Sequence, residues 1–201
     1  QADNAIRRYG SGRHRSSVLS LRAHYFQIKE GNQPGGKMHK VFLFGSRDVY
    51  GIPDMVVQHL ENIMAQTNGD VHFLVGDAQG IDASFHRTLS SIGAARKTTV
   101  YCMDYARNNA YDLETKVFSA EYDPDTKVVT IKSGDESYDT IEGIEKPDDL
   151  RYNRRFYEFK DAQMRNDCDF AICIWDGKSR GTFTNINVLK AQGKYVYVYT
   201  V

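Results

Sequence analysis

Short apolar runs alternate along this chain with segments whose apolar residues recur every three to four positions. The runs are nearly continuous, which is typical of strands buried on both faces. The predicted strands are Lys40–Phe44, Val71–Val75, Thr98–Met103, Phe170–Trp175 and Tyr195–Val201. The predicted helices are Pro53–Gln66, Ile81–Ile92, Asn153–Arg165 and Thr182–Gln192. Because strands alternate with helices, we expect an α/β fold with about five mostly parallel strands flanked by helices.

Residues 104–150 interrupt this alternation with an acidic insertion that carries thirteen acidic and five basic side chains. Lys116–Tyr122 and Lys127–Ser133 alternate polar and apolar residues around the turn signal Asp123-Pro124-Asp125, which predicts a β-hairpin. The remainder, 135–149, has the pattern of a polar loop. The insertion has too few apolar residues for a core of its own, so we expect it to belong to the surrounding domain.

Residues 1–37 form a basic N-terminal arm before the domain at 38–201, with seven basic and two acidic side chains. A solvated or oligomer-wrapping extension is the favoured interpretation, and a phosphate-binding arm or a linker are the alternatives. The whole chain balances 26 basic against 26 acidic side chains. This balance argues against a protein whose entire surface binds nucleic acid or an acidic membrane.

The composition, with 41% hydrophobic and 26% charged residues, is that of a globular protein. No apolar run approaches the ~18 residues of a membrane span, so no membrane partner is expected. Cys102, Cys168 and Cys173 form no CxxC pair and lie in or beside apolar runs. We therefore expect buried, reduced thiols and a cytoplasmic protein. No cluster of His, Cys and Asp has zinc spacing, so no metal is expected.

Three glycine-bearing turns follow predicted strands. They are Gly45-Ser46-Arg47, Gly76-Asp77-Ala78-Gln79-Gly80-Ile81-Asp82 and Gly177-Lys178-Ser179-Arg180-Gly181-Thr182. In an open parallel sheet such turns meet at the carboxyl ends of the strands, where ligands bind. Glycine admits close backbone approach, a helix start aims N–H groups at phosphate, and arginine adds a bidentate fork. The turns predict a site for a nucleotide or phosphorylated ligand, and the lack of GxxxxGK[ST] argues against P-loop ATP hydrolysis.

These motifs resemble the SLOG superfamily, which groups DprA-type DNA-processing proteins with Lonely Guy-type nucleotide enzymes. The first two turns and His86 are similar to the Rossmann-like domain of DprA. The third turn is similar to the Lonely Guy phosphate loop and, more distantly, to the nucleoside 2-deoxyribosyltransferases. The resemblance covers roughly residues 38–103 and 154–201. It implies a Rossmann-like fold whose crevice takes a nucleotide, a nucleoside or an ADP-ribose-like ligand.

The candidate ligand-binding residues come from all three turns and the helix after the last one. They are Gly45, Ser46, Arg47, Gly76, Asp77, Gly80, Asp82, Lys178, Ser179, Gly181, Thr182 and Asn185. Asn185 departs from the family pattern, because the Lonely Guy enzymes and the deoxyribosyltransferases have there a glutamate that acts on the glycosidic bond. An amide hydrogen-bonds ribose hydroxyls, but it cannot act as a nucleophile or proton acceptor.

Glu158 and Asp161 are the candidate catalytic carboxylates that could replace that glutamate, since residues at i and i+3 share a helix face. A solvated, charged helix face is the alternative. Asp82 either holds its own turn as a hydrogen-bond acceptor or binds ligand. His86 is expected to be packed or at the surface, and Tyr157 to pack, with stacking on a base as the alternative role for Tyr157.

Three functions remain open on the sequence. The first is binding of a nucleotide or nucleotide-derived ligand, such as an ADP-ribose-like or signalling nucleotide, without rapid turnover. The second is hydrolysis or transfer at an N-glycosidic bond through Asp161 or Glu158. The third is a DprA-like module that binds single-stranded nucleic acid, with 1–37 as its basic contact. A homodimer or higher homo-oligomer is also expected, and no cofactor other than the nucleotide ligand is implied.

Overall fold

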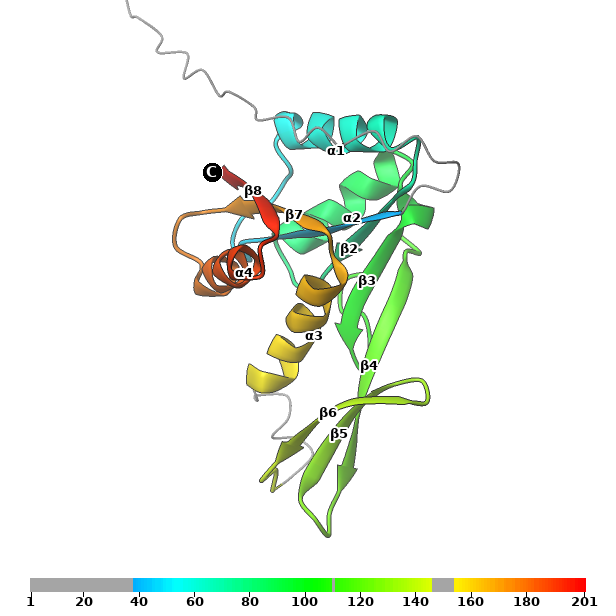
Figure 1. Ribbon diagram of the computed structural model, residues 1–201, viewed down its shortest axis with the longest axis vertical. Helices are drawn as coiled ribbons and strands as arrows, with labels where there is room; N and C mark the ends of the chain where they lie inside the picture. Colours follow the sequence, from blue (N-terminus) through cyan, green and yellow to red (C-terminus); the bar gives the residue numbers. More distant parts are fainter. Residues whose placement is uncertain (1–37, 110, 146–153) are drawn as a thin grey trace, which may run out of the picture. The chain divides into compact units, whose positions relative to one another are not determined.

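The computed structural model describes residues 38–109, 111–145 and 154–201, which all belong to one compact unit, Gly35–Val201 (Figure 1). The basic arm predicted at 1–37 lies outside the described residues. Among the described residues, no helix is long and apolar enough to cross a membrane.

One eight-stranded sheet organises this unit, in the order β6-β5-β4-β3-β2-β1-β7-β8. Its strands are β1 His39–Gly45, β2 Val71–Val75, β3 Thr98–Met103, β4 Glu114–Asp123, β5 Val128–Ser133, β6 Glu136–Glu142, β7 Phe170–Trp175 and β8 Tyr195–Thr200. All neighbours from β4 to β8 in that order pair in parallel. Only the β4–β5 and β5–β6 pairs are antiparallel, so the predicted α/β class with a mostly parallel sheet is confirmed.

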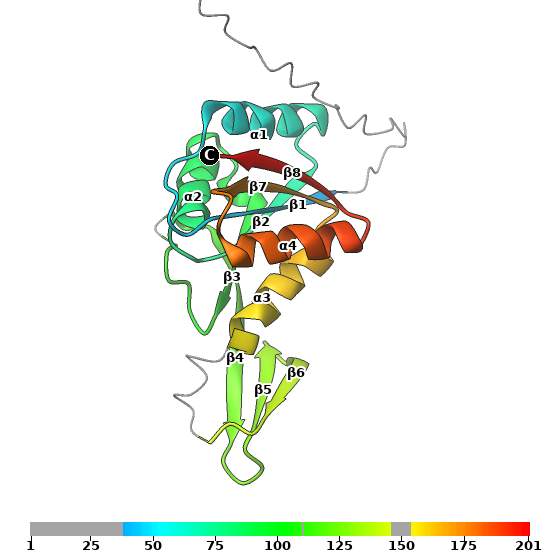
Figure 2. The ribbon, with the colours of Figure 1, turned by 90° about the vertical axis from the view of Figure 1, so that its left-hand side faces the viewer.

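Helices cover both faces of the sheet (Figure 2). They are α1 Asp54–Gln66, α2 Ile81–Ser91, α3 Arg154–Asp167 and α4 Arg180–Ala191, with a short 3₁₀ helix at Ala95–Lys97. Val41 and Leu43 pack with α1 and α2 in one core, and Phe42 and Phe44 pack with α3 and α4 in the other. Successive side chains of a strand point to opposite faces, so the segment 41–44 of β1 is apolar at every position because both of its faces are covered.

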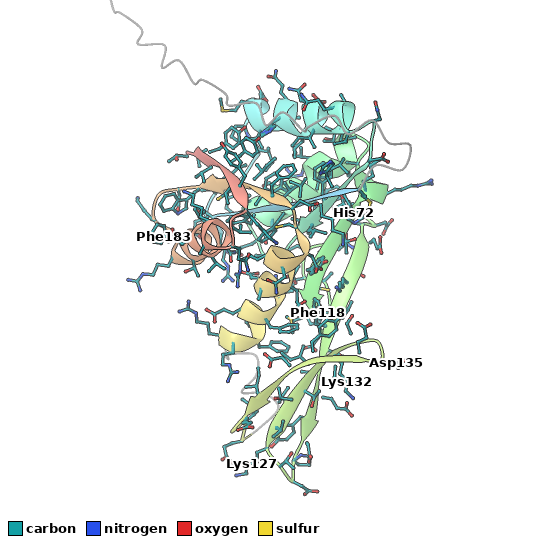
Figure 3. All side chains as sticks on the ribbon, viewed as in Figure 1. His72, Phe118, Lys127, Lys132, Asp135 and Phe183 are labelled. Atoms are coloured by element: carbon teal, nitrogen blue, oxygen red, sulfur yellow. The ribbon has the colours of Figure 1, made fainter. Side chains whose placement is uncertain are left out.

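The strand count exceeds the predicted number of about five, because the acidic insertion extends the same sheet. The predicted hairpin is present as β4 and β5, but the polar loop expected at 135–149 was wrong, since 136–142 forms β6. This strand lies at the sheet edge and buries only Ile141, so its sequence carries little apolar alternation. Phe118 of β4 packs edge-on against Phe159 of α3 at 5.2 Å, which joins the insertion to the main core (Figure 3).

The chain connections diverge between β1 and β7, which are neighbours within the parallel part of the sheet. After β1 the chain passes to α1 on one face, and after β7 it passes to α4 on the other. In open α/β sheets, a crevice forms at such a point outside the carboxyl ends of the strands. The turns that follow β1, β2 and β7 are therefore the place in this fold to examine for a candidate site.

Candidate functional site

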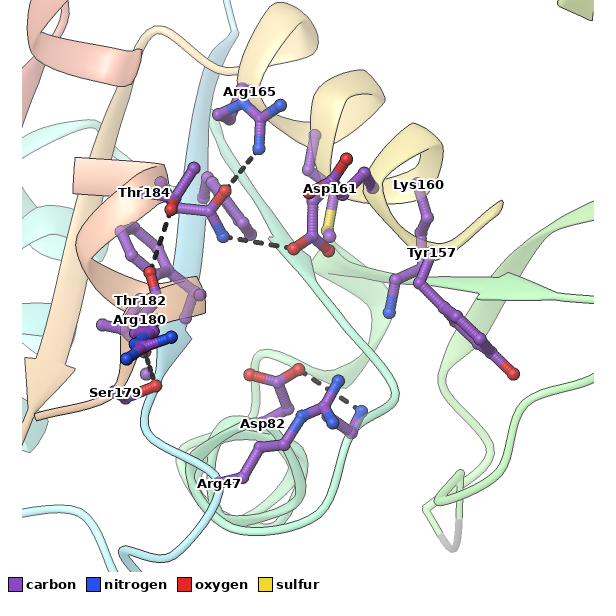
Figure 4. A pocket seen from close by; sticks show the side chains of 18 of the residues that line it. Arg47, Asp82, Tyr157, Lys160, Asp161, Arg165, Ser179, Arg180, Thr182 and Thr184 are labelled. Carbon is purple, nitrogen blue, oxygen red and sulfur yellow. Dashed lines mark hydrogen bonds between the residues drawn. The ribbon is translucent and has the colours of Figure 1, made fainter. Parts of the chain in front are cut away.

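A cleft of about 510 Å³ lies at these turns, between the first half of α4, the first turn of α2 and one side of α3 (Figure 4). Nine of the fourteen residues singled out from the sequence line it, and the other five are Ser46, Gly76, Asp77, Gly80 and Lys178. The cleft has six basic residues, namely Arg47, Arg107, Arg154, Lys160, Arg165 and Arg180. Three acidic residues, Asp82, Glu158 and Asp161, also line the cleft. This excess of positive charge favours an anionic ligand.

The turn after β1 contributes one exposed arginine and one buried serine. The Ser46 hydroxyl donates to Asp176 Oδ1 at 2.9 Å and accepts from the Asp176 backbone N–H at 3.1 Å. Ser46 is fully buried, so it ties the β1 turn to the β7 turn and does not face the cleft. Arg47 lines the cleft, and its side chain forms no hydrogen bond or ion pair with any described residue.

The turn after β2 is packed so closely that it requires glycine. A Cβ atom on Gly76 would lie 2.4 Å from Asp82 Oδ2 and 3.3 Å from Lys160 Nζ. Gly80 has a φ of +78°, and a Cβ atom there would lie 2.2 Å from the carbonyl oxygen of Arg47. Gly76 therefore leaves room for the Asp82 and Lys160 side chains, Gly80 leaves room for the Arg47 backbone, and neither glycine lines the cleft.

Asp77 anchors this turn through a buried ionic network. Its carboxylate accepts from Lys160 Nζ at 2.8 Å, and from Arg107 Nε and Nη2 at 2.9 Å each. Burial alone would raise the pKa of Asp77, but hydrogen bonds and charge from Arg107 and Lys160 outweigh it and hold the pKa well below its usual range. Asp77 and Lys160 are 1% and 4% exposed, so Asp77 positions the cleft residue Lys160 and is itself closed to a ligand.

His86 is fully buried on α2, in agreement with the expected packed role. Its Nε2 lies 2.8 Å from the carbonyl oxygen of Gly76, and its Nδ1 lies 2.7 Å from that of Asn108. Carbonyl oxygens only accept hydrogen bonds, so a neutral ring donates to one of them and a doubly protonated ring donates to both. His86 thereby joins the β2 turn to the connection between β3 and β4, which carries Arg107 into the cleft.

Asp82 holds its own turn, which is one of the two roles that the sequence left open, and it also faces the cleft. Its Oδ2 accepts from the backbone N–H of Ala78 at 3.3 Å, which holds the turn, and the residue also lines the cleft. Burial raises the pKa of Asp82 to about 7, with the negative charge of Asp161 adding to the effect and Lys160 opposing it. Its carboxyl group therefore exchanges a proton near neutral pH, which is unusual for an aspartate.

The turn after β7 is held by Asp176 and leaves the start of α4 open. Asp176 Oδ1 accepts from the backbone N–H groups of Ser179 at 2.8 Å and Lys178 at 2.9 Å, which keeps the pKa of Asp176 below its usual value. The Ser179 side chain caps no backbone group of α4, and a Cβ atom on Gly181 would meet nothing within 4 Å. The first turn of α4 thus faces open space in the cleft, whereas Lys178 is exposed outside it.

The side-chain hydroxyl groups of Ser179 and Thr182 lie in the same part of the cleft as Arg180. Thr182 Oγ1 donates to Ser179 Oγ at 3.0 Å, and both residues line the cleft beside Arg180 (Figure 4). The Arg180 side chain, like that of Arg47, has no hydrogen-bond or ion-pair partner among the described residues. Unpaired guanidinium groups beside an open helix start are suited to phosphate.

Asn185 links α4 to α3 across the cleft. Its Nδ2 donates to Asp161 Oδ2 at 3.2 Å, and its Oδ1 accepts from Arg165 Nη1. These two contacts fix the orientation of the amide and hold the Asp161 carboxylate in the cleft. Glu158 also lines the cleft, but it is exposed and accepts from Arg154 Nε at 2.5 Å as an i, i+4 pair.

Several cleft residues have no part in the motifs. Arg165 lies one helical turn after Asp161, so helical spacing alone places it on the same face. Arg107 comes from the β3–β4 connection, where no residue pattern points to a site; its guanidinium lies 5.3 Å from the centre of the Tyr157 ring. Tyr157 lines the cleft as well, so its ring can meet a ligand.

The cysteines contribute nothing to the cleft. All three are buried free thiols, and burial raises the pKa of each. Within 38–109, 111–145 and 154–201, no group of three or more His, Cys, Asp or Glu side chains is placed to hold a metal ion.

Comparison of the chain with protein-family models, with curated proteins and with solved structures gave no significant match.

Proposed function

We propose that the cleft binds a nucleotide or a nucleotide-derived ligand, with a phosphate group between Arg47, Arg180 and the first turn of α4. The observation that carries this proposal is the pair of unpaired arginines on two different βα turns of one cleft. Charge-assisted hydrogen bonds from guanidinium groups are among the strongest that a protein offers to phosphate. The resemblance of the three turns to SLOG proteins supports the same ligand class.

The rest of the cleft suits the sugar and base of such a ligand. The Asn185 amide keeps a second N–H after donating to Asp161, and the Asp161 carboxylate has further acceptor capacity. Together they can bind ribose hydroxyl groups. Tyr157 lines the cleft and offers an aromatic ring for a base.

Calorimetry with a small ligand panel tests this proposal. We expect adenosine monophosphate and ADP-ribose to bind at least about tenfold more tightly than adenosine, because only the first two engage the arginines. Equal affinity for adenosine would contradict a phosphate site. A single-stranded oligonucleotide in the panel tests the DprA-like alternative, which would be favoured if it alone binds.

Cleavage at an N-glycosidic bond is a second candidate function, and the environment of Asp82 favours it. Asp82 on α2 and Asp161 on α3 line the cleft from different elements (Figure 4). A protonated Asp82 could donate its proton to the leaving base while Asp161 accepts a proton from the attacking water. The raised pKa of Asp82 also makes the folded protein less stable as the pH rises from 3.8 to about 7. Over this range the unfolded chain ionises the carboxyl group and the folded chain does not.

Base release from adenosine monophosphate, followed by chromatography across pH, tests this second function. The pKa of Asp82 is about 7, so its protonated fraction and the rate should fall about tenfold per pH unit above that value. Asp82→Asn should remove this alkaline limb, whereas Asp48→Asn, at an exposed site outside the cleft, should keep it. Absence of release, or an unchanged profile in Asp82→Asn, would exclude the mechanism.

A further inference from the structure

The carboxyl group of Asp82 has one oxygen that is bound inside the protein and one that is not. Oδ2 accepts from the backbone N–H of Ala78 at 3.3 Å, and a Cβ atom on Gly76 would lie 2.4 Å from it. Oδ1 has no hydrogen-bond partner among the described residues. Within this part of the chain no buried side-chain oxygen lacks a partner, so Oδ1 is open to the cleft that Asp82 lines. A ligand in the cleft can therefore contact Oδ1.

Asp82 lies near the part of the cleft that suits the sugar and base of a nucleotide. Lys160 and Asp161 of α3 both act on its charge. Tyr157 precedes them by three and four residues, so it lies on the adjoining turn of the same helix, and it lines the cleft (Figure 4). If the phosphate lies at the start of α4 and the ribose at Asp161, as in the proposed function, the base extends toward Tyr157 and Asp82.

The hydrogen bond that Oδ1 offers to a base depends on the proton of the carboxyl group. A protonated carboxyl group donates its O–H, whereas an ionised one only accepts. Adenine has a hydrogen-bond acceptor at ring nitrogen N1, and hypoxanthine, which differs from it at position 6, has an N1–H donor there. We propose that Asp82 selects the base of the bound nucleotide, donating from Oδ1 to a ring-nitrogen acceptor when protonated and accepting from a ring N–H when ionised. This selection rests on the proposed nucleotide binding.

The change of preference falls close to neutral pH. Burial raises the pKa of Asp82 to about 7, Lys160 opposes this effect and Asp161 adds to it. The other charged or titratable groups beside Asp82 are Arg47, Asp77, Arg107 and Cys173. The pKa of Asp77 is held well below its usual range and burial raises that of Cys173, so neither group changes its charge between pH 6 and pH 8. The arginines keep their charge throughout.

Calorimetry of the full chain with adenosine monophosphate and inosine monophosphate at pH 6 and pH 8 tests this selection. Both ligands carry the same phosphate, so its ionisation cancels in the ratio of their dissociation constants. We expect the preference for adenosine monophosphate to fall at least about tenfold from pH 6 to pH 8. A ratio that does not change with pH would overturn the selection by Asp82 and leave the proposed nucleotide binding intact. Failure of both ligands to bind would overturn both.

The variant Asp82→Asn assigns the effect to this residue. The Ala78 N–H holds the amide oxygen in the place of Oδ2, so the amide N–H faces the cleft as the protonated Oδ1 does. We expect this variant to prefer adenosine monophosphate at both pH values, with a ratio that changes less than about twofold. Asp48→Asn, at an exposed site outside the cleft, should keep the wild-type pH dependence. A folded Asp82→Asn variant that also keeps it would overturn the proposal.

Discussion

Replacing Asp77 with alanine is expected to lower the free energy of unfolding by about 3–5 kcal/mol, the usual effect of removing one partner from a buried ion pair. Lys160 is 4% exposed and would keep its charge inside the protein without the carboxylate that it now contacts at 2.8 Å. Arg107 would also lose its acceptor, but its side chain is 36% exposed and can turn toward water. The lost stability therefore comes mainly from the buried charge of Lys160, which is left without its partner.

The pH dependence of this effect identifies its cause. Asp82 lies near the same ammonium group, and its pKa of about 7 leaves it protonated at pH 5 and ionised at pH 8. We expect urea unfolding to show a larger loss at pH 5, where no ionised Asp82 compensates Lys160. Asp70→Ala, which removes an exposed carboxylate, should change stability by less than about 0.5 kcal/mol. A similarly small change for Asp77→Ala would refute the buried network.

The double replacement of Arg47 and Arg180 by alanine is expected to weaken adenosine monophosphate binding at least about 100-fold. Each hydrogen bond to a charged group contributes about 1.5–3 kcal/mol, and two such losses exceed the free energy of a 100-fold change. Both side chains are unpaired and exposed, so the variant should melt at the wild-type temperature. Arg87→Ala with Arg96→Ala, two exposed residues outside the cleft, is the control for lost charge.

The strands β1, β2, β3 and β7 could be predicted from the sequence because burial on both faces leaves continuous apolar runs. The four helices could be predicted because their apolar residues recur every three to four positions. The helix α4 begins at Arg180, two residues earlier than predicted, because the Asp176 turn fixes the backbone there without an apolar signal. The strand β6 escaped prediction because this edge strand buries only Ile141 and therefore needs few apolar residues. The spacing of apolar residues thus identifies the helices and strands that are buried, and it misses those that are mostly exposed.

The site was predictable at the level of turns and not of individual side chains. The turn motifs point to Arg47, Thr182 and Asn185, which all line the cleft. Ser46 and Asp77 come from the same turns, but their side chains form internal pairs. Nothing in a single sequence separates a polar group that faces a ligand from one that is paired inside. Arg107 could not be found at all, because only the folded β3–β4 connection brings it to the cleft.

A thermodynamic cycle tests the central claim most directly. It compares adenosine monophosphate with adenosine, each bound by the wild-type chain and by the Arg47 and Arg180 double variant, in isothermal titration calorimetry. If the arginines hold the phosphate, the double variant loses at least about 100-fold in affinity for the monophosphate and less than about threefold for adenosine. An equal loss for both ligands, or no loss for the monophosphate, would contradict a phosphate site between these two turns.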